Sequence, residues 1–175
     1  MNFAGTSTLL SRAAFALCAL LAAGNGLVPQ ARAQDATNKL EAVDVQTLPG
    51  QQLQLKSLAG KPTLINLWAT WCAPCIVELP TLNAISNRAD LNLRVVTISQ
   101  DLGDPAKVQQ FLDQRGFAQL PAWIDTKGDL AVQYGVQTLP TTIFYDAQGR
   151  EVWRYVGGHD WSSPETQNLL SEGGA

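Results

Sequence analysis

The chain has 175 residues, of which 46% are hydrophobic and 15% are charged, and its formal net charge at pH 7 is −3. This length is sufficient for one domain with an ordinary apolar core. The slight acidic excess disfavours a nucleic-acid-binding protein, because such proteins carry a basic surface. We therefore expect no nucleic-acid partner.

Residues 1–33 have the pattern of a secretory signal peptide. Arg12 precedes the apolar run Ala13–Ala23, whose eleven residues are too few for a membrane-spanning helix of about 20. Ala31-Arg32-Ala33 gives the small-x-small pattern of a cleavage site. Cys18 follows Leu17 rather than a small residue, so we expect no lipid anchor, and Cys18 should leave with the signal. After cleavage we expect no stable membrane insertion.

The remaining domain, residues 34–175, keeps ten basic and fifteen acidic residues, for a net charge of −5. It also keeps only two cysteines, Cys72 and Cys75. Small exported domains often depend on several disulfides. This domain must therefore obtain its stability from an ordinary core.

The first elements of the domain are a β-hairpin and a buried strand. Val43 and Val45 alternate with polar residues, as do Leu53 and Leu55, and Pro49-Gly50 between them fits a type II turn. After a break comes the apolar run Thr63–Trp68, which predicts a central strand.

A helix follows the cysteines and is expected to run to about Ala89, with a kink at Pro80. Its apolar positions recur at helical spacing: Ile76, Leu79, Leu82 and Ile85. Leu91–Ile98 predicts the next strand, so that strand, helix and strand form a right-handed βαβ unit with a parallel pair. Asp104-Pro105 then begins a second helix, which Gly116 closes.

The last third of the chain contains short elements. Pro121–Ile124 predicts a strand, and Asp129 is expected to cap a brief helix. Thr141–Tyr145 and Glu151–Val156 predict an antiparallel hairpin, and residues 164–171 predict a final helix. The expected fold is α/β, with a mixed sheet flanked by helices on both faces and an additional N-terminal β-hairpin.

Cys72 and Cys75 lie where the central strand is followed by a helix. A thiol there meets the positive end of the helix dipole and unpaired N–H groups, and both favour the reactive thiolate. A zinc site needs about four ligands, whereas the domain adds only His159 to the two cysteines. A purely structural disulfide across two residues would restrain the unfolded chain very little. The pattern therefore favours a redox dithiol.

Three motifs together resemble the thioredoxin superfamily, and within it the exported TlpA/ResA/CcmG-like oxidoreductases. They are Trp71-Cys72-Ala73-Pro74-Cys75, Pro80, and Thr138-Leu139-Pro140-Thr141 before a strand. The early hairpin and Glu78 also match this exported branch, and residues 157–161 are most similar to TlpA. The resemblance implies a thioredoxin-like fold, a cis bond at Pro140 that faces the dithiol, and thiol:disulfide oxidoreductase activity. It implies no cofactor and no metal.

The central strand departs from ordinary thioredoxin at Asn66. Thioredoxin has a buried aspartate at that position, which relays protons, whereas Asn66 cannot titrate. The resemblance implies that Glu78, three residues after Cys75, takes over that work. The alternative interpretation of Glu78 is a solvated carboxylate on the helix surface. Asn66 itself needs only hydrogen-bond partners if it is buried.

The expected roles follow from position along the helix and from the resemblance. Cys72 is expected to be exposed and to attack the substrate disulfide, whereas Cys75 is expected to be buried and to resolve the mixed disulfide. Glu78 would exchange a proton with Cys75, while Trp71, Leu139 and Pro140 would line the substrate site. The remaining aromatic side chains are interpreted as packing or loop residues: Trp68, Trp123, Trp153, Trp161 and His159.

The leading functional hypothesis is a periplasmic protein-disulfide reductase in a bacterium. It would act as a monomer, receive electrons from a membrane-embedded donor, and reduce disulfides in exported proteins such as apo-cytochrome c or copper-site assembly proteins. A DsbA-type oxidase or isomerase is disfavoured, because Ala73-Pro74 replaces the Pro-His dipeptide of that oxidase. A copper- or zinc-binding chaperone would need a third ligand near Cys72 and Cys75. A peroxidase lacks support, since no threonine-proline-cysteine pattern is present.

Overall fold

A computed structural model describes residues 39–40, 44–46, 50–117 and 120–171. The predicted signal peptide, its cleavage site, Val43 and Pro49 of the first hairpin lie outside these residues. Within the described part of the chain, no helix is long and apolar enough to cross a membrane.

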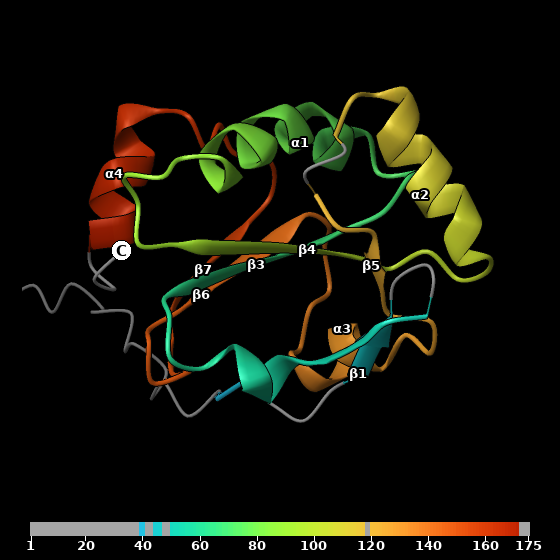
Figure 1. Cartoon of the computed structure of the whole chain (residues 1–175), viewed down its shortest axis with the longest axis horizontal. Coiled ribbons are helices and arrows are strands. Elements are labelled where there is room, and N and C mark those ends of the chain that lie inside the picture. The colour runs from blue at the N-terminus through green and yellow to red at the C-terminus, as the bar shows by residue number, and fades with distance from the viewer. Residues whose placement is uncertain (1–38, 41–43, 47–49, 118–119, 172–175) are drawn as a thin grey trace, which may run out of the picture. The chain divides into compact units, whose positions relative to one another are not determined.

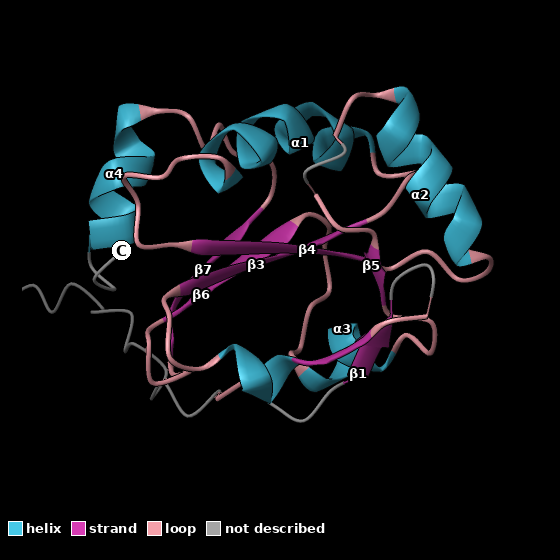
Figure 2. Cartoon of the chain, viewed as in Figure 1, coloured by secondary structure: helices cyan, strands magenta, loops and turns pink. Residues whose placement is uncertain are grey.

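The described strands form one mixed sheet in the order β2-β1-β5-β4-β3-β6-β7 (Figures 1 and 2). The β3–β4 and β4–β5 pairs are parallel, and the other pairs are antiparallel. The predicted parallel pair and the predicted C-terminal hairpin are therefore confirmed. The strands are β1 Asp44–Gln46, β2 Gln52–Gln54, β3 Thr63–Trp68, β4 Arg94–Ser99, β5 Trp123–Ile124, β6 Thr141–Tyr145 and β7 Glu151–Val156.

Helices cover both faces of the sheet, as predicted. Figure 1 shows α1, α2 and α4 on one side and α3 on the other, together with the 3₁₀ helix Leu55–Leu58. The helices are α1 Ala73–Ser86, α2 Pro105–Gln114, α3 Asp129–Gln133 and α4 Pro164–Ser171. This arrangement is the thioredoxin-like fold with an additional N-terminal hairpin.

The central strand β3 is buried along its whole length and divides the core in two. Leu64 packs with Leu79 of α1, whereas Ile65 packs with Leu130 of α3, because successive side chains of a strand point to opposite faces. Each fully buried side chain of this kind contributes about 1.5–3 kcal/mol. The two cores hold β3 firmly, and β3 in turn fixes the start of α1.

Several boundaries differ from the sequence prediction. Leu55 belongs to the 3₁₀ helix rather than to β2, and β4 begins only at Arg94. Helix α1 ends at Ser86 instead of about Ala89. At this end Asn87, the C-cap residue, donates from Nδ2 to the carbonyl of Asn83 at 2.7 Å. That side chain satisfies a free carbonyl of the last turn and so ends the helix early.

The short helix α3 is capped differently from the prediction. Gly128 is its N-cap, with φ +71°, and Asp129 is its first residue. The side chain that satisfies its free N–H groups is Asp125, which accepts from the nitrogens of Asp129 and Leu130 at 3.2 and 2.8 Å. The predicted cap, Asp129, is therefore wrong, because the fold places the Asp125 side chain at the start of the helix.

Candidate active site

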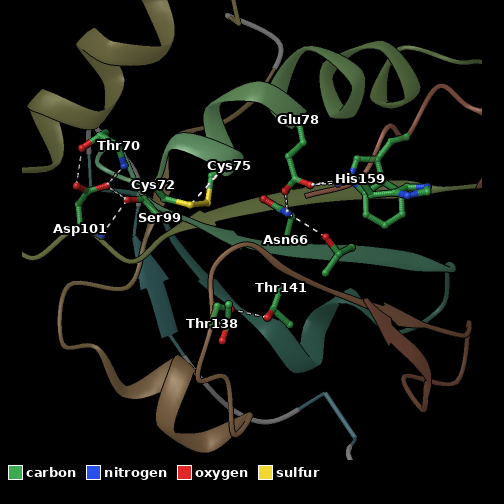
Figure 3. Close-up of a disulfide and its surroundings, with 12 residues drawn as sticks. Asn66, Thr70, Cys72, Cys75, Glu78, Ser99, Asp101, Thr138, Thr141 and His159 are labelled. Atoms are coloured by element: carbon green, nitrogen blue, oxygen red, sulfur yellow. Dashed lines mark hydrogen bonds between the residues drawn. A yellow bond between two sulfur atoms is a disulfide. The ribbon is translucent and has the colours of Figure 1, made fainter. Parts of the chain in front are cut away.

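The two cysteines form a disulfide at the N-terminus of α1 (Figure 3). Cys72 is the N-cap residue in extended conformation, and its Sγ accepts from the Cys75 N–H at 3.3 Å. Pro74 lies in the first turn, where a helix needs no N–H donor. A Cys72 thiolate would therefore be stabilised by the helix dipole and by a backbone donor.

The exposure of the two sulfur-bearing residues corrects one prediction. Cys72 is only 6% exposed and Cys75 is fully buried, so the expected order is confirmed but the expected exposure of Cys72 is wrong. Cys72 lies in the same apolar cluster as Trp68 and Leu79, because its bond to Cys75 turns its side chain towards the core. The neighbouring Trp71 is 70% exposed, so it is the large side chain at the surface next to this cysteine.

Glu78 is a buried carboxylate, not the solvated one of the alternative interpretation. It is 2% exposed and accepts three hydrogen bonds: from Asn66 Nδ2 at 2.6 Å, the His159 backbone nitrogen at 3.1 Å and Trp161 Nε1 at 3.3 Å. Burial raises the pKa of Glu78 above its ordinary value of 4.5, and the three donors lower it only in part. Glu78 therefore keeps its proton to a higher pH than an exposed glutamate does.

Asn66 joins the central strand to this carboxylate. Its side chain is fully buried, and Nδ2 donates both to Glu78 Oε1 and to Thr142 Oγ1, the latter at 2.9 Å. The expected partners of Asn66 are thus present for its nitrogen. Its Oδ1 has no hydrogen-bond partner in the described part of the chain.

The segment after β7 covers Glu78, and no pattern in the sequence predicted these contacts. Trp161 is 1% exposed and its indole N–H donates a hydrogen bond to Glu78, so it is more than a packing residue. The imidazole of His159 packs against the rings of Tyr155 and Trp161, which also contact each other, and its Nε2 lies 3.0 Å from Thr166 Oγ1. Within the described residues, no group of three His, Cys, Asp or Glu side chains could hold a metal ion.

A second carboxylate, Asp101, fixes the loop that leads into the dithiol. Its two oxygens accept from the Thr70 nitrogen at 2.9 Å, from Thr70 Oγ1 at 2.7 Å and from Ser99 Oγ at 2.6 Å. β3 and β4 are parallel neighbours, so their carboxyl ends place Thr70 beside Asp101. The sequence could have indicated this contact, since Asp101 closely follows the predicted strand.

The Leu139–Pro140 peptide bond is cis, as the family resemblance implied. Pro140 is buried, its carbonyl accepts from the Gly157 nitrogen at 2.9 Å, and Thr141 Oγ1 donates to the Thr138 carbonyl at 2.7 Å. Leu139 is half-buried and packs against the apolar cluster that contains both cysteines. A role of Trp71, Leu139 and Pro140 in substrate binding stays a prediction.

A surface hollow of about 500 Å³ extends from the cysteine motif to Glu78. Gly158 closes one side, and a Cβ atom there would lie 3.5 Å from the Pro74 carbonyl oxygen, so the two backbones pass close together. The lining residues are Pro74, Val77, Glu78, Thr81, Gly158, His159 and Asp160. Glu78, although buried, therefore lines a hollow at the surface.

A mixed sheet with a dithiol at a helix N-terminus and a cis-proline loop defines a thioredoxin-like redox protein. The sequence matches the Redoxin family over residues 27–170, and the chain belongs to that family. The resemblance to ResA-like oxidoreductases, expected from the motifs, is thereby confirmed at the level of the family.

Relatives with similar sequences are named for thiol–disulfide exchange. The chain is 33% identical to the thiol-disulfide oxidoreductase ResA of Bacillus thuringiensis (strain Al Hakam) over 114 residues, which is 65% of each chain. It is 34% identical to the thiol:disulfide interchange protein DsbE of Xylella fastidiosa (strain Temecula1) over 110 residues, 62% of this chain and 54% of that one. The matches thus span less than two thirds of these relatives' own length.

Solved structures share the fold over most of their length. A putative thiol:disulfide interchange protein DsbE from Chlorobium tepidum superposes with a TM-score of 0.67 at 26% identity, over 78% of this chain and 96% of that one. The exposed lipoprotein thioredoxin Etrx1 of Streptococcus pneumoniae gives a TM-score of 0.65 at 25% identity, over 74% and 98%.

Proposed function

We propose that the chain is a thiol:disulfide oxidoreductase that reduces disulfides in exported proteins. The observation that carries the proposal is the Cys72–Cys75 disulfide at the N-terminus of α1, three residues before the buried Glu78. The names of the ResA and DsbE relatives support the same chemistry.

The reaction has two exchange steps. In the reduced protein the Cys72 thiolate attacks a substrate disulfide, forms a mixed disulfide and releases one substrate thiolate. Cys75 then attacks the Cys72 sulfur, which restores the internal disulfide and releases the second substrate thiol. Two electrons pass to the substrate, and its two sulfurs take up two protons.

Glu78 is proposed to take the proton from Cys75 before the second step. Burial of Cys75 disfavours its thiolate, so the attack needs a base nearby. Burial also raises the pKa of Glu78, which makes it a stronger base than an exposed glutamate. The proton passes directly or through one water, and the hollow beside Glu78 connects it to solvent.

Trp71, Leu139 and Pro140 are proposed to bind the substrate. Trp71 offers an exposed aromatic surface next to Cys72. The loop at Leu139 adjoins the apolar cluster of the two cysteines and offers main-chain groups to an extended substrate strand.

The proposed location is the bacterial periplasm, with residues 1–33 as the cleaved signal and residues 34–175 as the thioredoxin-like domain. That compartment is oxidising, so a reductase there requires a membrane-embedded electron donor. The proposed substrates are disulfides of exported proteins, with apo-cytochrome c and copper-site proteins as the first candidates, and the domain is proposed to act as a monomer. The signal pattern in the sequence supports export.

The cysteine roles are tested by trapping. Cys75→Ser should accumulate a mixed disulfide between Cys72 and an insulin chain, whereas Cys72→Ser should accumulate none. In the reduced protein, iodoacetamide at mildly acidic pH should label Cys72 first, because the lower thiol pKa belongs at the helix N-terminus. Preferential labelling of Cys75 would reverse the assignment.

The direction of electron flow is tested by the reduction potential. Ala73 and Pro74 carry no charge that would stabilise a thiolate, and Glu78 adds negative charge nearby, so both favour the disulfide form. We expect a potential below about −200 mV, compared with about −120 mV for a strong oxidase. Equilibration with glutathione, followed by tryptophan fluorescence, measures it. A value near that of the oxidase would favour oxidation as the function, and bound copper or zinc in purified protein would favour the chaperone.

A further inference from the structure

The side-chain oxygen of Asn66 is a buried acceptor that the oxidised protein leaves unused. Asn66 is fully buried, and its nitrogen is satisfied by Glu78 and Thr142, whereas Oδ1 has no partner among the described residues. A buried polar group left unpaired costs about 1–3 kcal/mol. An apolar side chain at this position would avoid that cost, so a state in which Oδ1 is paired would account for the amide.

The orientation of the Asn66 amide is fixed by its neighbours. With Glu78 ionised, its carboxylate only accepts hydrogen bonds, so the Asn66 nitrogen faces Glu78 Oε1, 2.6 Å away, and the oxygen faces the other way. Figure 3 shows this oxygen on the side of the disulfide and the nitrogen towards Glu78. Glu78 lies one helical turn after Cys75, so the Asn66–Glu78 bond also holds β3 against this turn of α1.

The missing donor is one that reduction creates. In the disulfide the Cys75 sulfur carries no hydrogen and cannot donate. When an external dithiol reduces the protein, the S–S bond breaks and two electrons and two protons enter, while the reductant becomes a disulfide. One of these protons resides on the buried Cys75 sulfur, because burial favours its neutral form.

We propose that Asn66 Oδ1 accepts a hydrogen bond from the Cys75 thiol in the reduced protein. The Asn66 amide then binds the Cys75 thiol through Oδ1 and Glu78 through Nδ2. Asn66 is thus a positioning residue that responds to the redox state without titrating. The inference rests on the proposed function in one respect, since it requires the Cys72–Cys75 pair to be reduced and reoxidised.

The bond exists only in the reduced form, so it should stabilise that form. A thiol is a weak donor, and the equilibrium constant of reduction by glutathione should fall by only about threefold when the acceptor is lost. Asn66→Leu should therefore be slightly more reducing than the unaltered protein. Thr142→Val is the matched control, because it removes the other partner of the Asn66 nitrogen and leaves Oδ1 in place.

The amide resonances of Asn66 provide a test that needs no substitution. On reduction, the Asn66 side-chain carbonyl carbon should shift downfield as Oδ1 gains a donor. Asn83 is an internal control, since its Oδ1 also has no partner among the residues that the structure describes and should keep its shift. An unchanged Asn66 carbon in a protein whose disulfide has demonstrably been reduced would overturn the inference.

Infrared spectroscopy tests the donor. In Cys72→Ser, Cys75 is a lone thiol, and its S–H stretching band should lie at the lower frequency of a hydrogen-bonded thiol. Adding Asn66→Leu should move the band to higher frequency, whereas adding Thr142→Val should leave it in place. If Asn66→Leu does not fold, the carbon shift of the unaltered protein decides alone. Insulin reduction with no carbon shift and no band shift refutes this inference alone, whereas inactivity towards every disulfide substrate refutes the proposed function.

Discussion

Two carboxylates flank the dithiol and differ in how deeply they are buried. Glu78 and Asp101 each accept three hydrogen bonds, and Figure 3 shows them on opposite sides of the disulfide. Glu78 is 2% exposed, whereas Asp101 is half-buried. Burial adds a desolvation penalty at Glu78 that its three donors do not cancel, and this raises the pKa of Glu78.

The donors also come from different parts of the chain. Asp101 binds Thr70 and Ser99, which end two adjacent parallel strands, and so it fastens the loop before Cys72. Glu78 binds groups of Asn66, His159 and Trp161, which lie up to 83 residues away. The first carboxylate holds the loop, whereas the second is proposed to hold a proton.

The largest expected effect is on the rate of insulin reduction when each carboxylate is neutralised in turn. Glu78→Gln should slow insulin reduction by about 100-fold, the usual contribution of a positioned acid or base. Asp101→Asn should slow it less than about threefold, which is under 1 kcal/mol of barrier. The exposed Glu165→Gln serves as the charge control. Similar losses at positions 78 and 101 would remove the distinction between the two groups.

The sequence predicted the parts of the fold that local periodicity determines. The bounds of β3, β6 and β7 were correct, because continuous apolar or alternating runs are bounded by clear turns. The strand-to-helix position of Cys72 and the cis bond before Pro140 were also anticipated. The motif and the resemblance were sufficient for these features.

The sequence did not predict contacts between residues that are far apart in the chain and meet only in the folded structure. Trp161 was interpreted as packing, since no local pattern shows that its N–H meets a carboxylate 83 residues away. Cys72 was expected to be exposed, and the structure buries it in the core that α1 and β3 share. No role was predicted for Asp101, although its position after β4 places it next to Thr70.

A smaller effect should appear in the stability of the loop. Asp101→Ala leaves the Thr70 nitrogen and two hydroxyls without their acceptor, which should lower the free energy of unfolding by about 1–3 kcal/mol. Asp101→Asn should recover most of this loss, because one amide oxygen can accept the Thr70 N–H and the hydroxyls can rotate to accept. Urea unfolding of the oxidised proteins measures both values. Equal losses in the two variants would show that charge, not hydrogen bonding, holds the loop.

The smallest expected effect is a dependence of stability on pH, and its sign distinguishes the buried carboxylate from an exposed one. Burial raises the folded-state pKa of Glu78 above 4.5, so its contribution to stability is fully present below about pH 4.5 and is lost as pH rises through the folded pKa. Relative to Glu78→Gln, the unaltered protein should therefore lose stability as pH rises above about 4.5.

Asp160, which lines the same hollow, provides the opposite case. Hydrogen bonds from Ser162 lower the pKa of Asp160 below 3.8, so its contribution is present above that pH and is lost as pH falls through the folded pKa. Relative to Asp160→Asn, the unaltered protein should lose stability only in acid. Urea unfolding in steps from about pH 3 to pH 8 gives both differences. Two slopes of the same sign would mean that the Glu78 carboxylate is not desolvated in solution, and the proton-transfer role assigned to it would lose its physical basis.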